Sequence, residues 1–429
     1  METSFIIFLI VAILLILSTL LFPKIKLGKM NISLYWVIVL FGAILSIILG
    51  NVSINDLKNV FISNNSSNPL KILILFFSMT FLSIFLDEVG VFSHIAKRVT
   101  RIVKHSQIKF FSIIYILCSV LTIFTSNDIV ILTFTPFIIY FSKHCKVNPI
   151  PYLIGEFVAA NTWSMMLLIG NPTNIYLGLN ANINFVDYFL TMSLPTLGCG
   201  LVQFILLILI FKNKLKIKIN VENSRLNKLD KLDVIVGSAH LFCCLICLIL
   251  SNYIELEMYL FSLGFALSLL LYILFSSIFK KENRVLLKGT IKRLPYSLIP
   301  FVLGMFIIVF SLTNNGISNI FSKILNRNCD FITYGYSSFL MCNVMNNIPM
   351  SILYSSFVIS KESIYASIIG SNIGAFLTPI GALAGIMFTA LLAKYGVKFS
   401  FLDFTKYGVI LSIPTITIAL LILKLVLSF

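Results

Sequence analysis

Asn161–Gly170, with the sequence NTWSMMLLIG, reappears loosely as Asn372–Gly381, NIGAFLTPIG. Three of the ten positions are identical: the first, the ninth and the tenth. Each copy lies in an apolar segment and contains residues that suit an unwound helix. Two broken membrane helices in corresponding places of one chain are typical of a transporter with a solute site near the middle of the membrane. The pair therefore predicts two related halves.

The composition indicates a polytopic membrane protein. The chain has 429 residues, of which 59% are hydrophobic and 11% charged, whereas about 25% of the residues of a soluble domain are charged. The longest polar stretch, Lys212–Lys231, has the length of a connector between two halves. The N-terminus lacks a basic region, and Phe5–Phe22 is long enough to span a bilayer, so we expect a first span there and no cleaved signal.

The formal net charge of +16 does not indicate a nucleic-acid partner. Basic residues of membrane proteins gather in cytoplasmic loops, and this accounts for the excess. The eight cysteines show no zinc-binding spacing. Cys243, Cys244 and Cys247 lie in an apolar segment and are expected to face lipid or other helices; a thiol site for a soft metalloid is the alternative.

Two of the apolar segments are interrupted by polar residues. Segment 110–141 is divided at Thr125–Asp128, and segment 331–359 is divided by Asn343 and by Asn346–Pro349. Each part is shorter than the roughly 20 residues that a span needs. We therefore predict two re-entrant hairpins, because polar backbone at membrane depth is tolerated only where it lines a cavity. The full set of apolar segments lies near residues 5–22, 31–50, 70–92, 110–141, 150–179, 188–211, 233–251, 258–279, 297–313, 331–359, 364–393 and 404–427.

The distribution of Lys and Arg predicts the orientation. With both termini outside the cell and both hairpins returning to their own side, the cytoplasmic loops hold 26 of the 32 basic residues. This bias agrees with the positive-inside rule and places the protein in the plasma membrane as a multi-pass protein with a cytoplasmic central linker. The loops concerned are 23–30, 93–109, 142–148, 212–232, 280–296 and 394–406.

These patterns predict an all-α membrane protein with ten spans and two hairpins. The first half, 1–211, and the second half, 233–429, each contain five spans and one hairpin, and the linker 212–232 joins them. The first hairpin opens to the inside and the second to the outside. The halves are therefore predicted to be inverted repeats whose broken helices meet at the middle of the membrane.

Asn-rich breaks mark the candidate solute site. In the first hairpin we expect the second helix to start at Ile129, and in the second hairpin we expect Asn347 to be the cap and Pro349 to lie in the first turn. The first broken span should open at Gly170–Asn174. The second should open around Gly370–Gly374 and again at Thr378–Gly381.

Helix N-termini and freed carbonyls at such breaks bind anions, polar solutes or cations. The alternative for each Asn is a cap or an inter-helix hydrogen bond without ligand contact. The predicted substrate-binding residues are Ser126, Asn127, Asn161, Thr162, Asn171, Thr173, Asn174, Asn346, Asn347, Ser371, Asn372 and Thr378.

Two carboxylates lie deep in apolar segments, Asp128 and Glu156. An ionisable residue inside the membrane is a functional candidate, so both are predicted to bind a coupling ion, H⁺ or Na⁺; for Glu156 a buried structural acceptor is the alternative. Asp87 and Glu88 are expected at the membrane interface. No metal site and no other cofactor is predicted.

At these motifs the chain resembles the arsenite/antimonite permeases of the ion-transporter superfamily, which also includes sodium-coupled dicarboxylate, citrate and sulfate carriers and sodium/proton antiporters. The matching stretches are Ser126–Asp128 with Thr135-Pro136, Ala160–Thr162 leading to Gly170–Ile175, Val344–Pro349, and Gly370–Gly374 through Thr378–Ala384. The arsenite permeases carry Asp where this chain has Asn161 and Asn372. Asn at both places resembles the sodium sites of the dicarboxylate carriers.

The resemblance implies a secondary active transporter for a small inorganic anion or metalloid, with arsenite or antimonite efflux as the family default, by elevator-like alternating access coupled to an ion gradient. The alternative is a sodium-coupled carrier of organic dicarboxylate, citrate or sulfate. The Lys residues of the predicted spans lie at span edges, so no Arg or Lys is expected deep in a span to neutralise a dianion, which weighs against that alternative. No catalytic Ser, His and Asp set or metal cluster is visible in the spans, so an enzyme is not expected. A homodimer is left open.

Overall fold

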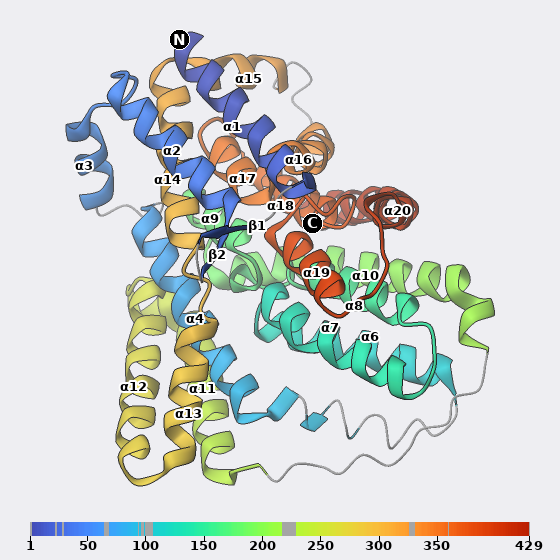
Figure 1. Ribbon diagram of the computed structural model, residues 1–429. Helices are drawn as coiled ribbons and strands as arrows, with labels where there is room; N and C mark the ends of the chain where they lie inside the picture. Colours follow the sequence, from blue (N-terminus) through green and yellow to red (C-terminus); the bar gives the residue numbers. More distant parts are fainter. Residues whose placement is uncertain are drawn as a thin grey trace.

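The computed structural model is helical almost throughout (Figure 1). It describes residues 2–428 except 22–23, 28–29, 64–67, 93, 96–97, 99–105, 217–228, 326–330 and 359. The predicted linker 212–232 therefore lies largely outside the described residues. Two short antiparallel strands form a hairpin near the N-terminus, which the sequence did not predict.

The elements of the first half follow one another in a simple order. They are α1 (Glu2–Leu21), β1 (Lys24–Leu27), β2 (Met30–Ser33), α2 (Leu34–Ile48), α3 (Ile54–Ile62), α4 (Pro69–Val89), α6 (Gln107–Phe124), α7 (Asn127–His144), α8 (Ile150–Trp163), the 3₁₀ helix η1 (Leu168–Gly170), α9 (Pro172–Asn180) and α10 (Phe185–Leu215).

The described helices α1–α4 and α6–α10 follow the same order as α11–α14 and α16–α20 of the second half, whereas α15 has no counterpart among the described residues. The elements are α11 (Lys231–Ile254), α12 (Met258–Phe279), α13 (Lys281–Arg293), α14 (Leu298–Asn314), α15 (Ile317–Leu325), α16 (Phe331–Met345), α17 (Asn347–Ser355), α18 (Lys361–Gly374), α19 (Leu383–Lys394) and α20 (Phe401–Leu427). The inverted relation of the halves and their boundaries stay predictions.

Seven helical stretches in the described part of the chain are long and apolar enough to cross a membrane. They are α4, α6, α10, α11, α12, the stretch that contains α13 and α14, and α20. The two broken spans are missing from this set because each is divided into shorter helices. Both arms of the first hairpin, α6 and α7, have 18 residues and are about 27 Å long. The expectation that each arm is too short to span was therefore wrong for this hairpin, of which α6 is also apolar enough to cross.

Both interrupted segments nevertheless return to the end from which they start. Phe110 near the start of α6 stacks on Phe141 near the end of α7, with ring centroids 4.0 Å apart. At the same end the Tyr152 hydroxyl of α8 donates to Gln107 Oε1 over 2.6 Å. The arms α6 and α7 are therefore antiparallel.

The second hairpin has the same form. Tyr334 near the start of α16 has ring contacts with Tyr354 in α17 and with Phe357 just after it, at centroid distances of 6.4 and 6.5 Å. The arms α16 and α17 are therefore antiparallel as well.

The ten-residue pair falls at the same place in both broken helices. Asn161 is the third residue from the end of α8, and Asn372 is the third from the end of α18. Each donates its Nδ2 to the carbonyl four residues earlier, Phe157 at 2.8 Å and Ile368 at 2.9 Å. The shared local geometry explains why Asn occurs at both positions.

The break in the second span is shorter than predicted. Gly370–Gly374 is helical within α18, and the chain unwinds only over Ala375–Ala382. The expected opening at Gly370–Gly374 was therefore wrong. These glycines instead permit close helix packing, because a Cβ at Gly370 would overlap Ser338 Oγ and the Gly335 carbonyl oxygen of α16.

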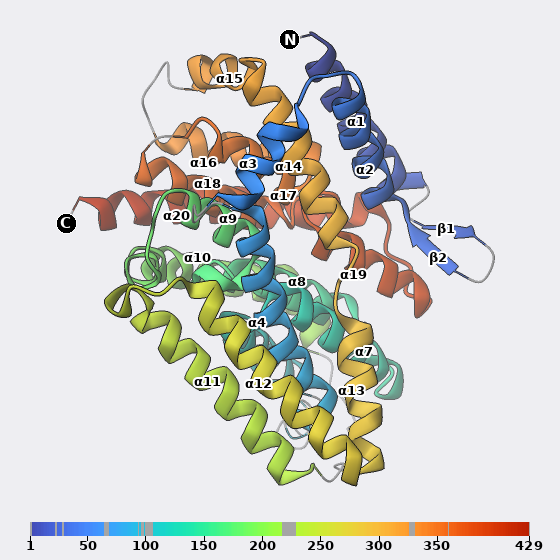
Figure 2. The ribbon, with the colours of Figure 1, turned by 90° about the vertical axis from the view of Figure 1, so that its left-hand side faces the viewer.

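The helices form two groups around the breaks. We call α1–α4 and α11–α14 the scaffold group, and α6–α10 and α16–α20 the core group. In both ribbon views α10 and α20 lie side by side and cross the direction of α4 and α12 (Figures 1 and 2). In Figure 2, α11, α12 and α13 pack together against the lower part of α4.

We predict that Gly370→Ala destabilises the protein. The added methyl would collide with α16, and overpacking of this kind costs about 1–3 kcal/mol. The unfolding midpoint of the purified protein in detergent should fall by several degrees. Gly264→Ala in α12 is the matched control, because no atom lies within 4 Å of the added Cβ. An equal fall in both variants would contradict the packing argument.

Candidate functional site

The tip of the first hairpin is bonded to the first broken span. The helix α7 begins at Asn127, with Ser126 as N-cap residue, so the expected start at Ile129 was wrong. Asn127 Oδ1 accepts from the Asp128 amide at 3.0 Å, and its Nδ2 donates to Asn161 Oδ1 at 3.1 Å. Asn127 and Asn161 are thus hydrogen-bonded neighbours; their role in a solute site stays a prediction.

Three hydroxyls around this tip are buried without a hydrogen-bond partner among the described residues. They belong to Ser126, Thr162 and Thr122, of which the first two were predicted site residues. Buried polar atoms without a partner are uncommon in proteins. Their oxygens add acceptor capacity next to Asn127 and Asn161.

Asn372 joins the two halves of the chain. Its Oδ1 accepts from Asn171 Nδ2 at 3.0 Å, and its Nδ2 donates to Asn174 Oδ1 at 2.7 Å. Ser164 Oγ lies 3.0 Å from Asn372 Oδ1 and 2.8 Å from the Asn161 carbonyl oxygen, so its single hydrogen is shared between them. With the bond to its own helix, the Asn372 amide has used all its hydrogen-bonding capacity.

Neighbouring predicted residues extend the contact between the halves. Asn171 is the N-cap of α9 and accepts from the Thr173 amide at 3.2 Å. Asn174 Nδ2 donates to the Ser164 carbonyl at 2.9 Å. The hydroxyls of Thr173 and Ser371 lie 3.4 Å apart. The breaks in the two halves therefore meet in one buried polar network.

The tip of the second hairpin is held by main-chain bonds. Asn346, at φ 77°, is the N-cap of α17, so the prediction that Asn347 is the cap was wrong. Asn346 Nδ2 donates to the Ile380 carbonyl at 3.0 Å, and the Asn347 amide donates to the Gly381 carbonyl at 3.0 Å. The tip thus lies against the break that follows α18.

Asn343 is a site residue that the list of predicted residues lacked. Its Oδ1 accepts from Thr378 Oγ1 at 2.6 Å and from the Thr378 amide at 3.1 Å, and its Nδ2 donates to the Gly374 carbonyl at 3.0 Å. It fixes predicted residue Thr378 to the hairpin. Its polarity within an apolar segment was the signal, although it had been used only to divide that segment.

Glu156 lies inside the core group and away from solvent. Its side chain is 0% exposed and accepts from Thr135 Oγ1 of α7 at 3.0 Å. The bond joins α8 to the hairpin arm one residue before Pro136. Both roles predicted for Glu156, proton carrier and structural acceptor, stay predictions.

Asp128 lines a cavity of about 490 Å³, which we call the hairpin-one cavity. No hydrogen bond or ion pair reaches its carboxylate from the described residues. The cavity lies between α2, α4, the α13–α14 connection, α7 and α19. Its polar and charged lining residues are Ser33, Tyr35, Thr80, Asp128, Arg293, Ser297 and Lys394.

Asp87 has a largely buried side chain. Its side chain is 6% exposed and lies 2.6 Å from Arg293 Nη2, while Glu88 accepts from Arg293 Nη1 at 2.7 Å. The interfacial position expected for Asp87 and Glu88 stays a prediction, since burial within the protein does not measure depth in the membrane. The Arg293 guanidinium bridges both carboxylates with charge-assisted hydrogen bonds from two different nitrogens, which stabilises the pair of negative charges.

A second cavity of about 370 Å³ lies between α3, α9, α14 and α17, and we call it the α17 cavity. Its lining has no charged residue and includes Asn59, Asn68, Asn180, Thr313 and Ser355. In the helix order of the two halves, α3, α9, α14 and α17 are the counterparts of α13, α19, α4 and α7, which line the hairpin-one cavity. On the predicted repeat, four corresponding elements line both cavities.

A small apolar pocket of about 20 Å³, the apolar constriction, lies between the two cavities. Phe76 and Leu298 line both this pocket and the hairpin-one cavity. Tyr176 lines both this pocket and the α17 cavity. The three spaces thus follow one boundary between the scaffold and core groups.

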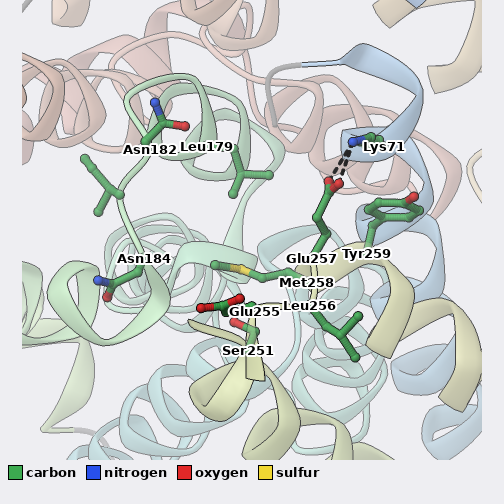
Figure 3. A pocket seen from close by; sticks show the side chains of 11 residues that line it. Lys71, Leu179, Asn182, Asn184, Ser251, Glu255, Leu256, Glu257, Met258 and Tyr259 are labelled. Atoms are coloured by element: carbon green, nitrogen blue, oxygen red, sulfur yellow. Dashed lines mark hydrogen bonds and ion pairs between the residues drawn. The ribbon is translucent and has the colours of Figure 1, made fainter. Parts of the chain in front are cut away.

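A third cavity, of about 310 Å³, contains none of the predicted site residues (Figure 3). It lies where the α9–α10 connection faces the α11–α12 connection. Figure 3 shows Lys71 bonded to both carboxylate oxygens of Glu257, each at 2.7 Å, with Tyr259 beside it. Its basic residue is thus already paired. Within the described parts of the chain, no group of three or more His, Cys, Asp or Glu residues could hold a metal ion.

A family model described as a citrate transporter, CitMHS, matches residues 12–363 of the chain. The arsenical pump membrane protein of Escherichia coli is 23% identical over 322 residues, which are 72% of each chain. The putative transporter arsB of Dictyostelium discoideum is 28% identical over 144 residues, 34% of this chain and 25% of that protein. The silicon efflux transporter LSI3 of Oryza sativa subsp. japonica is 23% identical over 208 residues, 44% of this chain and 41% of that protein.

A solved structure has the same fold. The crystal structure of the Alcanivorax borkumensis YdaH transporter matches with a TM-score of 0.56 and 12% identity, over 99% of this chain and 98% of that one. The likeness supports the predicted fold class and extends over both halves.

We predict that Asn372→Ala lowers stability more than Asn283→Ala. The first change removes the partners of Asn171 Nδ2 and Asn174 Oδ1, and each unsatisfied buried group costs about 1–3 kcal/mol. Asn283 is similarly buried, at 3% exposure, and bonds Ser276 in the scaffold group. Thermal unfolding in detergent compares them. If Asn372→Ala lowered the unfolding midpoint less than Asn283→Ala, the buried network would not contribute to stability as argued.

Proposed function

The chain belongs to the CitMHS citrate transporter family, and from this premise we propose that it is a secondary active transporter of a small hydroxylated inorganic solute, of which arsenite is the type. The core group would carry the solute past the scaffold group by alternating access. The chain is a multi-pass membrane protein, and the known relatives are transporters and not enzymes.

The two cavities are the observation that carries this proposal. They are built from corresponding helices of the two halves and are separated by the apolar constriction. A transporter made of two related halves needs two such vestibules, of which one is open to the site at a time. A channel would need a continuous path, and the apolar side chains of Phe76, Leu298 and Ile348 interrupt it here.

The hairpin-one cavity is the open vestibule in this arrangement. It reaches Asp128 at the tip of the first hairpin, whereas the α17 cavity touches α17 only at Ile352 and beyond, away from Asn347 at the second tip. If the basic loops face the cytoplasm, as the charge bias predicts, Arg293 and Lys394 place this vestibule on the cytoplasmic side.

The charges of the open vestibule favour a neutral solute over a dianion. Arg293 is already paired with Asp87 and Glu88, and Asp128 adds a carboxylate at the deep end. Lys394 is exposed at the rim. A neutral metalloid hydroxide could donate its hydroxyls to Asp128, whereas a dicarboxylate would meet a like charge there. The relatives named for arsenical and silicon efflux support this class.

The coupling ion is proposed to bind at the first hairpin tip. Asp128 faces the open vestibule. The partnerless hydroxyls of Ser126, just before α7, and of Thr162, next to Asn161 in α8, belong to the elements that meet at this tip. A carboxylate takes up H⁺, and a set of oxygens can hold Na⁺. Glu156, which is closed off from the vestibule and bonded to Thr135, would then serve as a structural acceptor.

We predict that Asp128→Asn abolishes the dependence of transport on the driving gradient. In sealed vesicles, pH- or sodium-driven uptake should fall at least tenfold, because the amide can neither take up a proton nor supply a charge. Asp56→Asn, an exposed change in the first turn of α3, is the control and should leave uptake unchanged. Gradient-driven uptake that survives in Asp128→Asn would remove Asp128 as the coupling group.

The substrate class is tested by expression in an arsenite-sensitive host. We expect the wild-type chain to raise arsenite resistance and to leave sodium-dependent succinate and sulfate uptake at background, because the open vestibule has no unpaired cation at its deep end. Vesicle uptake of radiolabelled succinate gives the second measurement. Sodium-dependent succinate uptake without arsenite resistance would instead establish the dicarboxylate alternative.

A further inference from the structure

A direct hydrogen bond joins the moving hairpin to the scaffold group. Thr133 Oγ1 of α7 donates to Asp87 Oδ2 of α4 over 2.7 Å. The same Asp87 oxygen lies 2.6 Å from Arg293 Nη2. One carboxylate oxygen therefore holds both a scaffold cation and a hairpin hydroxyl.

The two helices are separated by the hairpin-one cavity over the preceding turns. Thr80 and Ile84 of α4 line this cavity from one side, and Asp128 and Leu132 of α7 line it from the other. Asp87, one turn after Ile84, and Thr133, directly after Leu132, come together at the edge of this cavity. The bond is thus a polar connection at the end of an open gap.

From this geometry we infer that Asp87 is a positioning residue of the transport cycle, which holds the first hairpin in the state with the hairpin-one cavity open. The inference rests on the proposed function in one respect, the movement of α7 relative to α4. It assigns Asp87 no contact with substrate or coupling ion.

The partners of Asp87 determine which state of the transporter its bond with Thr133 stabilises. When α7 moves along α4, the Thr133 bond is lost, but the ion pair with Arg293 stays because both residues belong to the scaffold group. Asp87 is therefore never left as an unpaired buried charge. The state with the hairpin-one cavity open keeps one additional charge-assisted bond, and that bond favours it.

Arg293 sets the place of the carboxylate. Its Nη1 is 2.7 Å from Glu88 Oε1, while its Nη2 holds Asp87. The planar fork holds two adjacent carboxylates in a fixed geometry, whereas the donors of an ammonium rotate freely. The position along α4 at which Asp87 bonds to Thr133 is therefore fixed.

Cysteine accessibility tests the inference without any substrate. In a background without the eight native cysteines, Ala390→Cys reports on the hairpin-one cavity and Thr313→Cys on the α17 cavity. A membrane-impermeant maleimide is applied from each side. We expect Thr133→Val to lower the labelling rate of the first reporter relative to the second by about tenfold, as the loss of one charge-assisted bond implies.

Thr196→Val is the matched control. The Thr196 side chain is buried, and its hydroxyl donates to the Met192 carbonyl within its own helix at 2.7 Å. This variant should label as the wild type does. If Thr133→Val also labels as the wild type, the inference is wrong, whatever the substrate is.

A double-mutant cycle separates positioning from helix packing. Asp87→Ala and Thr133→Val should shift the labelling ratio in the same direction, and the double variant should shift it no further than Asp87→Ala alone. Additive shifts would overturn the direct connection. If the labelling ratio shifts but the wild type transports none of the tested solutes, the inference stands and the proposed substrate fails.

Discussion

The arrangement of the core group depends on the need to satisfy buried amides where two helices are broken. The interior of a membrane protein offers little water to hydrogen-bond the polar groups that a helix break exposes. The polar groups of the two breaks must therefore bond to each other. The side chain of Asn372 accepts a hydrogen bond from Asn171 and donates one to Asn174, both in the other half of the chain. The two broken spans are therefore one structural unit, although 201 residues separate Asn171 from Asn372.

The same constraint explains why the boundary between the two groups differs from the interior of the core group. Polar bonds connect the hairpin tips to the breaks within the core group, whereas the constriction against the scaffold group is lined by Phe76, Leu298 and Val302. Apolar side chains can slide past one another without leaving a polar group unsatisfied. This distribution suits the proposed movement of the core group as one body, with contacts such as Thr133 to Asp87 holding it at particular positions.

Much of the fold could be predicted from the sequence because its signals were local. Apolar length, polar interruptions and matched Asn residues predicted the two hairpins and the breaks, and Asn161 and Asn372 do occupy the same position in their helices. The bounds of the breaks could not be predicted, because Gly370 suits both an unwound turn and a close helix contact. The contact with α16 decides between them, and no local pattern records it.

Pairings across the fold were equally invisible in the sequence. No local sequence pattern predicts that Arg293 bridges Asp87 and Glu88, or that Asn343 bonds to Thr378, because these partners are more than 30 residues apart. The network also accounts for the departure from the arsenite permeases at position 372. An ionised Asp there would face Asn174 Oδ1 and the Ile368 carbonyl, both acceptors, where the Asn372 amide now donates. An amide at this position therefore suits a structural joint. On the proposed function, it leaves Asp128, which lines the hairpin-one cavity, as the carboxylate available to a coupling ion.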